Sequence, residues 1–390
     1  MRILFVDATK SLLARYPLSI LDDIKSDFND IEAFFISYDS GFEERDRSDK
    51  AIKKIESFEN YNLINGNFFK RKSIEKILDD LKPDLVLFGG YRLPDMLWIA
   101  ICNLLKYKTI LLQHGFDIDH IKRSTSGMFY NVKKNFNYLK TLIQYSKIIE
   151  EPFIVTFAIY MRHLFFGLKL FNTRIGVPIG WPTKFLIYSD YYRKLFFKKY
   201  GIEKSRMKVI GSIDVYNILN ISKNKRIHSA CYLAQTFVED NRMSLKDFKK
   251  LILFYSELAA KLDSFYIKMH PRSNISLFSE LIDLSNVKII NNYFPSCSAY
   301  IGHYSSTLFT ASYLSRCIII HEIDNEPIPE IYKSCANLIS KDINEIADAI
   351  VNCDSTIPGI DEVEEKIGYI APMPKKNPIS LIKDEIIKII

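Results

Sequence analysis

The feature that most constrains the fold is a repeated alternation between short apolar runs and longer helical stretches. Met1–Asp7 (MRILFVD) and Leu85–Phe88 (LVLF) have the composition of buried strands, and each is followed by a stretch with helical periodicity. After an interruption the alternation resumes at Lys184–Ser189 (KFLIYS), and Ser229–Ala234 (SACYLA) starts a second α/β unit. Strands that alternate with helices predict parallel sheets covered by helices on both faces, so the expected fold class is α/β.

The chain length indicates two domains of this kind. Its 390 residues exceed one ordinary domain, and an apolar fraction of 48% is enough for two buried cores. We expect two Rossmann-like domains that face one another across a cleft, an N-terminal domain over 1–219 and a C-terminal domain over 220–375. The segment 376–390 is expected to form a helix that packs back on the N-terminal domain.

One segment interrupts the alternation and carries the basic excess of the chain. Residues 121–182 are expected to form a basic and apolar helical insertion in the N-terminal domain. The formal net charge is +7, and residues 121–189 hold ten Lys and Arg against two acids, a net of +8. No nucleic-acid-binding motif is visible, so nucleic acid is not an expected partner. An anionic membrane surface or a phosphate-bearing acceptor fits the charge better.

Phe153–Leu170 within this insertion predicts an apolar helix. Its uninterrupted apolar run ends at Arg162 and is too short to span a bilayer. A narrow polar stripe on a wide apolar face is typical of a helix that lies in the membrane interface. We therefore expect a peripheral membrane contact through 122–182. The alternative is a helical hairpin buried between domains or in a homodimer.

The cysteines and the N-terminal residues indicate a reducing compartment. The six cysteines lie far apart without a CxxC pair, and most are in apolar stretches. The segment MRILFVDATKS lacks the long apolar region and the cleavage site of a signal peptide. We expect a cytoplasmic protein at the inner face of the cytoplasmic membrane.

The first candidate site follows the expected strand Phe265–Met269. His270, Pro271 and Arg272 come directly after this strand, and Pro271 fixes the path of the chain as it leaves the sheet. Together with Lys268 they make a cationic, hydrogen-bonding strand end that suits a phosphate oxygen. The alternative for this motif alone is a solvent-exposed loop.

The second candidate site is the hydroxyl cluster Ser305, Ser306 and Thr307, which follows the expected strand Ala299–Ile301 and opens a helix. Hydroxyl groups at a helix start are first of all N-caps. With free backbone N–H groups and the helix dipole they also form an anion site. His303 is expected to support this cluster, and His321 is expected to be packed or solvated rather than to line the cleft.

The segments KMHPRSN and YIGHYSSTLF resemble the "HP" and "S/T" motifs of bacterial sialyltransferases, Kdo transferases and CDP-polyol phosphotransferases, which are GT-B enzymes. The resemblance implies that His270 binds the donor phosphate and helps CMP or CDP to leave. It implies that Ser305, Ser306 and Thr307 hold the same phosphate, and that Gln235 and Thr236 lie on the donor side. It also implies catalysis without a metal ion or another cofactor, with a nucleotide-sugar donor, expected to be CMP-linked, as the substrate.

An inverting transfer needs a base for the acceptor hydroxyl. Asp117, Asp119 and Asp7 are the candidate carboxylates, and the first two are preferred because they lie beside His114 and His120. The alternative for Asp117 is a turn residue. In a polyol-phosphate transferase His114, within QHG, would be the base instead.

The expected function is a GT-B glycosyltransferase that moves an acidic sugar from a CMP-linked donor to a surface-glycan or lipid-linked acceptor. Sialic acid or a related nonulosonate is the first choice of sugar, and Kdo is the second. The chemical alternative is a CDP-glycerol or CDP-ribitol phosphotransferase. Two further alternatives are a non-catalytic glycan- or membrane-binding subunit and a UDP-sugar epimerase or transferase, for which Glu322 is the candidate ribose ligand.

Overall fold

The computed structural model divides the chain into two compact units. Unit 1 comprises the described residues within 1–115, 122–211 and 374–390, and unit 2 comprises those within 212–373. The boundary follows Gly211, whereas the sequence predicts it after residue 219. The structure describes residues 1–7, 16–28, 30–37, 52–58, 61–66, 71–113, 115, 132–166, 178–221, 227–239, 242–270, 273–291, 293–324, 328–354 and 356–390.

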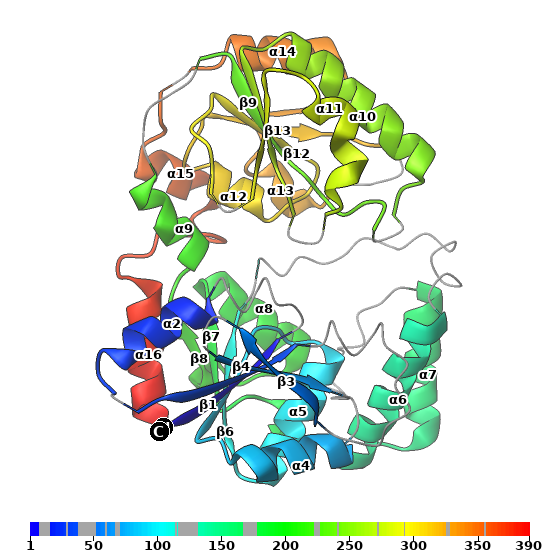
Figure 1. Ribbon diagram of the computed structural model, residues 1–390, viewed down its shortest axis with the longest axis vertical. Helices are drawn as coiled ribbons and strands as arrows, with labels where there is room; N and C mark the ends of the chain where they lie inside the picture. The colour runs from blue at the N-terminus through cyan, green and yellow to red at the C-terminus, as the bar shows by residue number, and fades with distance from the viewer. Residues whose placement is uncertain are drawn as a thin grey trace. The chain divides into compact units, whose positions relative to one another are not determined.

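The sheet of unit 1 has eight strands in the order β3-β4-β2-β1-β5-β6-β7-β8 (Figure 1). Neighbouring strands are parallel except β3 and β4, which are antiparallel. The core of β1 is buried on both faces, as expected for a continuous apolar run. The strands are β1 (Arg2–Asp7), β2 (Glu32–Ser37), β3 (Ile52–Phe58), β4 (Tyr61–Gly66), β5 (Leu85–Phe88), β6 (Lys108–Leu112), β7 (Lys184–Ile187) and β8 (Met207–Val209).

The helices of unit 1 come from two parts of the sequence, one before unit 2 and one after it. The last of them, α16, packs against α2, where the Lys383 ammonium lies 3.5 Å from Asp23 Oδ2 and 3.1 Å from Asp27 Oδ2. The helices of unit 1 are α2 (Pro17–Lys25), α4 (Arg71–Leu81), α5 (Leu93–Leu104), α6 (Val132–Ile148), α7 (Phe153–Phe166), α8 (Asp190–Tyr200) and α16 (Pro378–Ile389).

The expected helical insertion contains α6 and α7, which pack against each other (Figure 1). Helix α6 also packs against α5, in which every residue from Leu93 to Cys102 is buried. Residues 167–170 of the expected apolar helix lie outside the described part of the chain. Among the described helices, none is long and apolar enough to cross a membrane.

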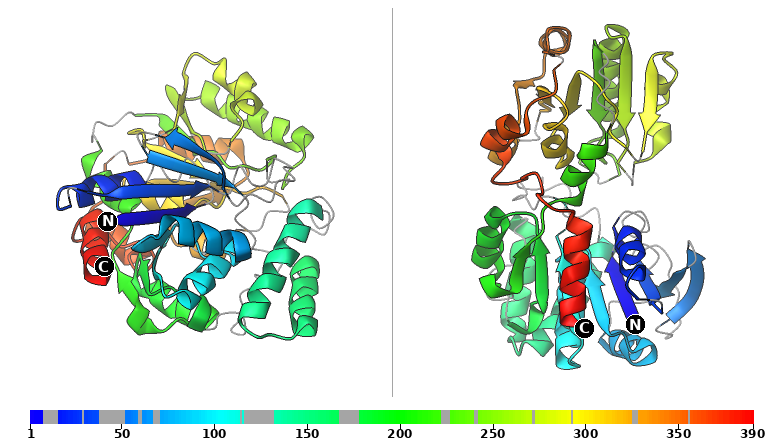
Figure 2. Two further views of the ribbon diagram at one scale, coloured as in Figure 1. Left: turned by 60° about the horizontal axis from the view of Figure 1, so that its bottom comes forward. Right: turned by 90° about the vertical axis from the view of Figure 1, so that its left-hand side faces the viewer.

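The sheet of unit 2 is fully parallel, with six strands in the order β11-β10-β9-β12-β13-β14. Figure 2 shows strands of this sheet side by side. Phe248 and Tyr255 of α10 and Ile346 of α14 belong to one buried cluster with Ala230 and Tyr232 of β9. The strands are β9 (Ser229–Leu233), β10 (Ser264–Lys268), β11 (Val287–Ile290), β12 (Ala299–Gly302), β13 (Cys317–His321) and β14 (Leu338–Ser340). The helices are α9 (Ile213–Asn217), α10 (Leu245–Ala260), α11 (Ser279–Ile282), α12 (Thr307–Ala311), α13 (Glu330–Lys333), α14 (Ile343–Val351) and α15 (Ile360–Ile367).

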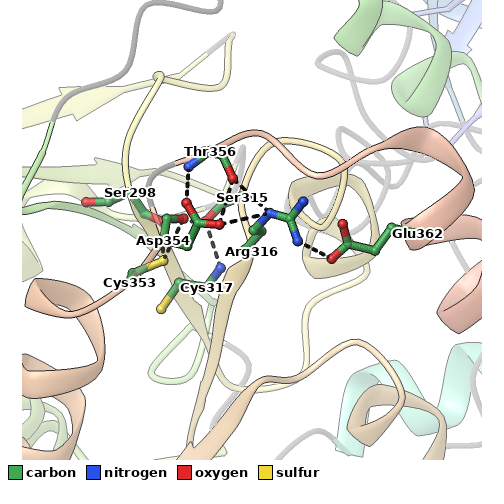
Figure 3. A network of polar contacts seen from close by, with 8 residues as sticks. All are labelled: Ser298, Ser315, Arg316, Cys317, Cys353, Asp354, Thr356 and Glu362. Carbon is green, nitrogen blue, oxygen red and sulfur yellow. Dashed lines mark hydrogen bonds and ion pairs between the residues drawn. The ribbon is translucent and has the colours of Figure 1, made fainter.

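A polar network fixes the segment between α14 and α15 at the start of β13 (Figure 3). The Arg316 guanidinium donates to Glu362 Oε1 at 2.6 Å and to Thr356 Oγ1 at 3.0 Å, and its Nε lies 3.4 Å from Asp354 Oδ2. Since Arg316 precedes β13, this network lies at the amino-terminal edge of the sheet. It stabilises unit 2 at the edge opposite to the one at which parallel sheets bind ligands.

We expect a single methyl group added at Gly211 to destabilise the protein strongly. Its φ is +84°, and a Cβ there would lie 2.6 Å from Cγ of Pro374, which also belongs to unit 1. We expect Gly211→Ala to lower the free energy of unfolding by about 2 kcal/mol or more, because backbone strain and overpacking add. Urea denaturation measures the change.

Gly359→Ala is the matched control, because a Cβ at Gly359 meets no heavy atom within 4 Å and its φ is −64°. This control should cost less than about 1 kcal/mol. Equal losses in the two variants would contradict the role assigned to Gly211.

Candidate functional site

Three loops of unit 2 lie at one edge of its sheet, because the strands that precede them are parallel neighbours. Gln235 and Thr236 follow β9, His270 follows β10, and Ser305–Thr307 follow β12. The loops are close at their origin: the Ala234 N–H donates to the Lys268 carbonyl at 3.0 Å. The structure therefore brings the predicted donor residues of three separate segments to one edge.

This edge contains the point at which the strand order reverses. From β9 the chain passes to β10 and β11 on one side, and β12 then pairs with β9 on the other side. In open parallel sheets, ligands bind outside the carboxyl ends of the strands at such a point. Gln235 and Thr236 follow the strand at which the reversal occurs.

The hydroxyl cluster has a different local structure from the one that the sequence predicts. The helix that the sequence predicts at this cluster is only α12, Thr307–Ala311, which is too short for a helix-dipole anion site. The Ser312 hydroxyl bonds to the Leu308 carbonyl at 2.9 Å, and the Tyr313 N–H bonds to the carbonyl of Thr310, three residues back, which ends the α-helical pattern.

Within this cluster the side chains of Ser305 and Thr307 hydrogen-bond to each other, and the Thr307 N–H donates to Ser305 Oγ at 3.4 Å. The Ser306 hydroxyl does not cap the helix. All three residues are half-buried. The cluster is therefore a compact group of hydroxyls whose possible anion binding rests on the side chains rather than on a helix dipole.

Lys268 and His270, at the end of β10, differ from each other in their contacts. The Lys268 ammonium donates to the carbonyls of Asn291 and Tyr293 at 3.2 and 3.1 Å and lies 4.8 Å from the centroid of the Phe294 ring. These contacts secure the loop after β11. His270 is half-buried, and its carbonyl accepts from the Ser273 N–H at 2.8 Å. Pro271 and Arg272 lie outside the described residues.

A buried polar network lies beside the hydroxyl cluster. His303 directly precedes Tyr304 and the cluster, and its Nδ1 is 2.8 Å from the His321 carbonyl, which only accepts. Nδ1 must therefore carry the proton, and Nε2 accepts from the Tyr232 hydroxyl at 3.2 Å. His321 Nδ1 in turn lies 2.9 Å from the Tyr255 hydroxyl. The network joins β9, α10 and the ends of β12 and β13.

Burial keeps both imidazoles of this network neutral. Desolvation lowers the pKa of His303 well below its ordinary value, with a contribution from His321, and lowers the pKa of His321 to about 4. As the sequence predicts, His321 is packed, and His303 is buried two residues before the hydroxyl cluster. Neither imidazole is suited to proton transfer near neutral pH, because the charged form of each is disfavoured.

The structure adds Arg242 to the site, which the sequence does not indicate. Its guanidinium carbon lies 4.7 Å from the centroid of the Phe237 ring and 4.6 Å from that of Tyr304. Two aromatic faces thus hold a permanent positive charge beside the residue that precedes Ser305. No local pattern marks Arg242, because its two partners come from separate loops.

Glu239 is the second residue that the sequence does not indicate. It lies in the turn after β9, and its Oε1 accepts from the Asn274 N–H at 2.7 Å. This bond connects the loop after β9 with the loop that contains His270. The two loops are therefore joined by a carboxylate at the edge of the site.

The predicted acceptor-side residues belong to unit 1, and the structure describes few of them. Asp7 is the last residue of β1, and β1 pairs with β5 at the strand reversal of this sheet. Gln113 accepts from the Tyr188 N–H at 2.9 Å and donates to the Gly115 carbonyl at 3.1 Å, and Gly115 has a φ of +67°. The candidate bases His114, Asp117 and Asp119 lie outside the described residues.

Metal-binding side chains do not gather in the part of the chain that the structure describes. No group of three or more His, Cys, Asp and Glu residues there could hold a metal ion.

Comparison with known proteins identifies the fold. No family model matches the chain, and no curated protein matches its sequence. The UDP-GlcNAc 2-epimerase of Methanocaldococcus jannaschii, in complex with UDP-GlcNAc and UDP, matches with a TM-score of 0.53 and 15% identity over 100% of both chains. The UDP-GlcNAc 2-epimerase of Neisseria meningitidis, bound to UDP-GlcNAc, gives 0.50 and 14% over 100% of both chains. A structure of the wall teichoic acid polymerase TagF gives 0.58 and 12%, over 99% of this chain and 88% of that one.

These similarities confirm the predicted fold class. The chain has a two-domain α/β fold of the GT-B type. None of the three structures is a sialyltransferase or a Kdo transferase. Sequence identities of 12–15% show that the fold is shared, and they do not identify the substrate of this chain.

The neutral imidazoles predict that unit 2 is acid-sensitive. In the unfolded chain both histidines have their ordinary pKa of 6.5, and folding lowers it. Above that pH neither state binds protons there. As the pH falls from 6.5 towards 4, the unfolded chain binds protons that the folded state excludes. We expect the free energy of unfolding to fall by up to about 1.4 kcal/mol per pH unit for each imidazole, measured by urea denaturation.

Two variants test whether the buried imidazoles cause this pH dependence. His303→Asn removes one of the two titrating groups, so the loss of stability with falling pH should be shallower than in the wild type. His321→Asn removes the other titrating group and should make the slope shallower as well. A wild-type slope in His303→Asn would refute the assignment.

Proposed function

We propose that this chain is a metal-independent GT-B transferase that binds a nucleotide-activated donor at the carboxyl-terminal edge of the unit 2 sheet. The observation that carries the proposal is the gathering of Gln235–Thr236, His270 and Ser305–Thr307 at the strand reversal beside β9. Bound nucleotide phosphate at this edge meets hydroxyl donors, an imidazole and the fixed charge of Arg242.

These groups suit the departure of a nucleotide. Negative charge develops on the phosphate oxygen as the transferred group leaves, and preorganised donors and cations stabilise that charge. In the proposed mechanism His270 binds the donor phosphate by a hydrogen bond and helps the nucleotide to leave. The hydroxyls of Ser305, Ser306 and Thr307 hold the same phosphate. Arg272 and Pro271 remain part of the proposed donor site. The contacts of Lys268 support a role in holding the neighbouring loop.

The acceptor side of the proposal rests on unit 1. A carboxylate or an imidazole must take the proton of the attacking hydroxyl. Asp117 and Asp119 are the preferred bases for a sugar transfer, with Asp7 as the alternative, and His114 takes this role in a polyol-phosphate transfer. The acceptor that we propose is a surface glycan or a lipid-linked glycan.

Two donors are proposed. A CMP-linked acidic sugar, with sialic acid or a related nonulosonate before Kdo, follows from the HP and S/T motifs of the sequence. CDP-glycerol or CDP-ribitol is the second candidate, and a specific observation favours it: the teichoic acid polymerase TagF is among the structures that share this fold. The UDP-GlcNAc 2-epimerases with the same fold make UDP-GlcNAc a necessary third substrate to test.

The donor is identified by incubating the purified protein with CMP-sialic acid, CMP-Kdo, CDP-glycerol and UDP-GlcNAc. Nucleotide release from a CMP-sugar supports the first candidate, and release from CDP-glycerol alone supports the second. Interconversion of UDP-GlcNAc without net transfer would instead show an epimerase.

His270 predicts a large effect on this reaction. We expect His270→Ala to lower kcat/KM for the identified donor about 100-fold or more, because the leaving phosphate loses its hydrogen-bonding partner. His228→Ala removes an imidazole directly before β9, at the other end of that strand from the candidate loops, and should retain wild-type activity. Unchanged donor binding and unchanged cell-surface polymer in His270→Ala would favour the non-catalytic subunit.

We also propose that α7 contacts the inner face of the cytoplasmic membrane. Phe153, Ile154 and Phe157 at its start are 64%, 76% and 43% exposed, and the two phenyl rings lie 6.2 Å apart. Exposed Lys140 and Lys147 of α6 contribute to the basic excess of this part of the chain, against Glu150 and Glu151 in the turn. An apolar patch within a basic region fits an anionic lipid surface.

This contact is tested by sedimentation with vesicles of phosphatidylglycerol and phosphatidylethanolamine. The wild type should sediment with them and not with phosphatidylcholine alone, and replacing Phe153, Ile154 and Phe157 together by Ser should abolish binding.

The matched control replaces three other exposed apolar residues, Leu245, Leu253 and Ile275 of unit 2, by Ser, and should bind as the wild type does. If the α7 variant instead changes a dimer into a monomer without affecting vesicle binding, the patch joins two copies of this chain.

A further inference from the structure

Three buried polar atoms at the candidate site have no hydrogen-bond partner among the described residues. They are Gln235 Oε1, Glu239 Oε2 and Ser273 Oγ. Buried polar atoms in folded proteins are nearly always paired, because an unpaired one loses its bonds to water without replacement. Three such atoms at one sheet edge therefore need an explanation.

The three atoms belong to two loops that are joined to each other. Glu239 accepts through Oε1 from the N–H of Asn274, the residue after Ser273. The Ser273 N–H bonds to the carbonyl of His270. Gln235 comes directly after Ala234, which pairs with the strand that ends before His270. The unpaired atoms thus come from the loops that flank the proposed phosphate ligand.

The chemistry of these three atoms determines which kind of ligand group can form hydrogen bonds with them. An amide oxygen and a carboxylate oxygen only accept hydrogen bonds, and a serine hydroxyl can accept or donate. A phosphate oxygen also accepts, and a carboxylate repels it. The phosphate of a donor therefore does not belong here. A group that offers O–H donors, such as the hydroxyls of a ribose or of a polyol, does.

On these grounds we infer that Gln235, Glu239 and Ser273 form a hydroxyl-binding pocket for the nucleotide-activated donor, with Glu239 as its principal acceptor. This inference rests on the proposed function. The hydroxyls come either from the ribose of the nucleotide or from the group that is transferred. Binding exchanges the donor's bonds to water for bonds to atoms that have none in the free protein, so the pocket is selective for hydroxylated ligands.

The test compares the wild type with Glu239→Gln, which keeps the oxygen that accepts from Asn274 and turns the unpaired oxygen into an N–H donor. Calorimetry with CMP, 2′-deoxy-CMP and CDP-glycerol measures binding. We expect Glu239→Gln to weaken binding of the hydroxyl-bearing ligand about tenfold or more. Glu280→Gln, at an exposed position on α11, should bind as the wild type does.

The ligands separate the two sources of the hydroxyls. If the ribose is bound, the wild type prefers CMP to 2′-deoxy-CMP and Glu239→Gln loses this preference. If the transferred group is bound, the variant binds CMP normally and CDP-glycerol weakly. Equal binding of all ligands by wild type and variant would overturn the inference and leave the proposed function intact, whereas a wild type that binds no nucleotide would overturn the proposed function itself.

A second measurement separates binding from folding. Because Glu239→Gln replaces an unpaired buried carboxylate oxygen, the free variant should unfold at the same or a higher urea concentration than the wild type. Weaker binding together with a lower unfolding midpoint would show that Glu239 is structural, and would overturn the inference as well.

Discussion

The parallel pairing of β9 with β10 on one side and with β12 on the other is the constraint on which unit 2 depends. All five residues of β9 are buried, so the strand contributes apolar surface to both faces of the sheet. A register slip of one residue would exchange its two faces and bury the wrong side chains. Since three candidate loops leave the sheet from these strands, the same pairing that builds the core determines which side chains meet at its edge.

Hydrogen bonds inside the core reinforce that pairing. Tyr232, His303, His321 and Tyr255 link two strand ends, a central strand and a helix through bonds of 2.8 to 3.2 Å. A buried polar network with every member paired favours one arrangement of its elements over its near alternatives. His303 directly precedes Tyr304, which packs on Arg242, so the start of the hydroxyl-bearing loop is held from inside the sheet.

The sequence predicts the strand ends of this protein well and the contacts between loops poorly. His270 and Ser305 are predictable because an apolar run stops directly before each motif, and the period of a strand is a local signal. Arg242 and Glu239 are not, because their partners Tyr304 and Asn274 are far away in the sequence. Helix α12 ends before Ser312, whose hydroxyl donates to the Leu308 carbonyl, a contact that the sequence does not indicate. The strands β3 and β4 are also hard to predict from the sequence, because they mix polar and apolar residues without an apolar run.

The position of α16 has a consequence for the order in which the chain acquires its structure. This helix packs on α2, yet it is synthesised after the whole of unit 2, so unit 2 is an insertion within unit 1 in chain order. During translation the sheet of unit 2 has all six of its strands as soon as β14 has left the ribosome. Unit 1, although begun earlier, lacks the contact of α16 with α2 until α16 emerges. Unit 1 is therefore completed only after unit 2, and its unfinished surface is the one that a chaperone would meet.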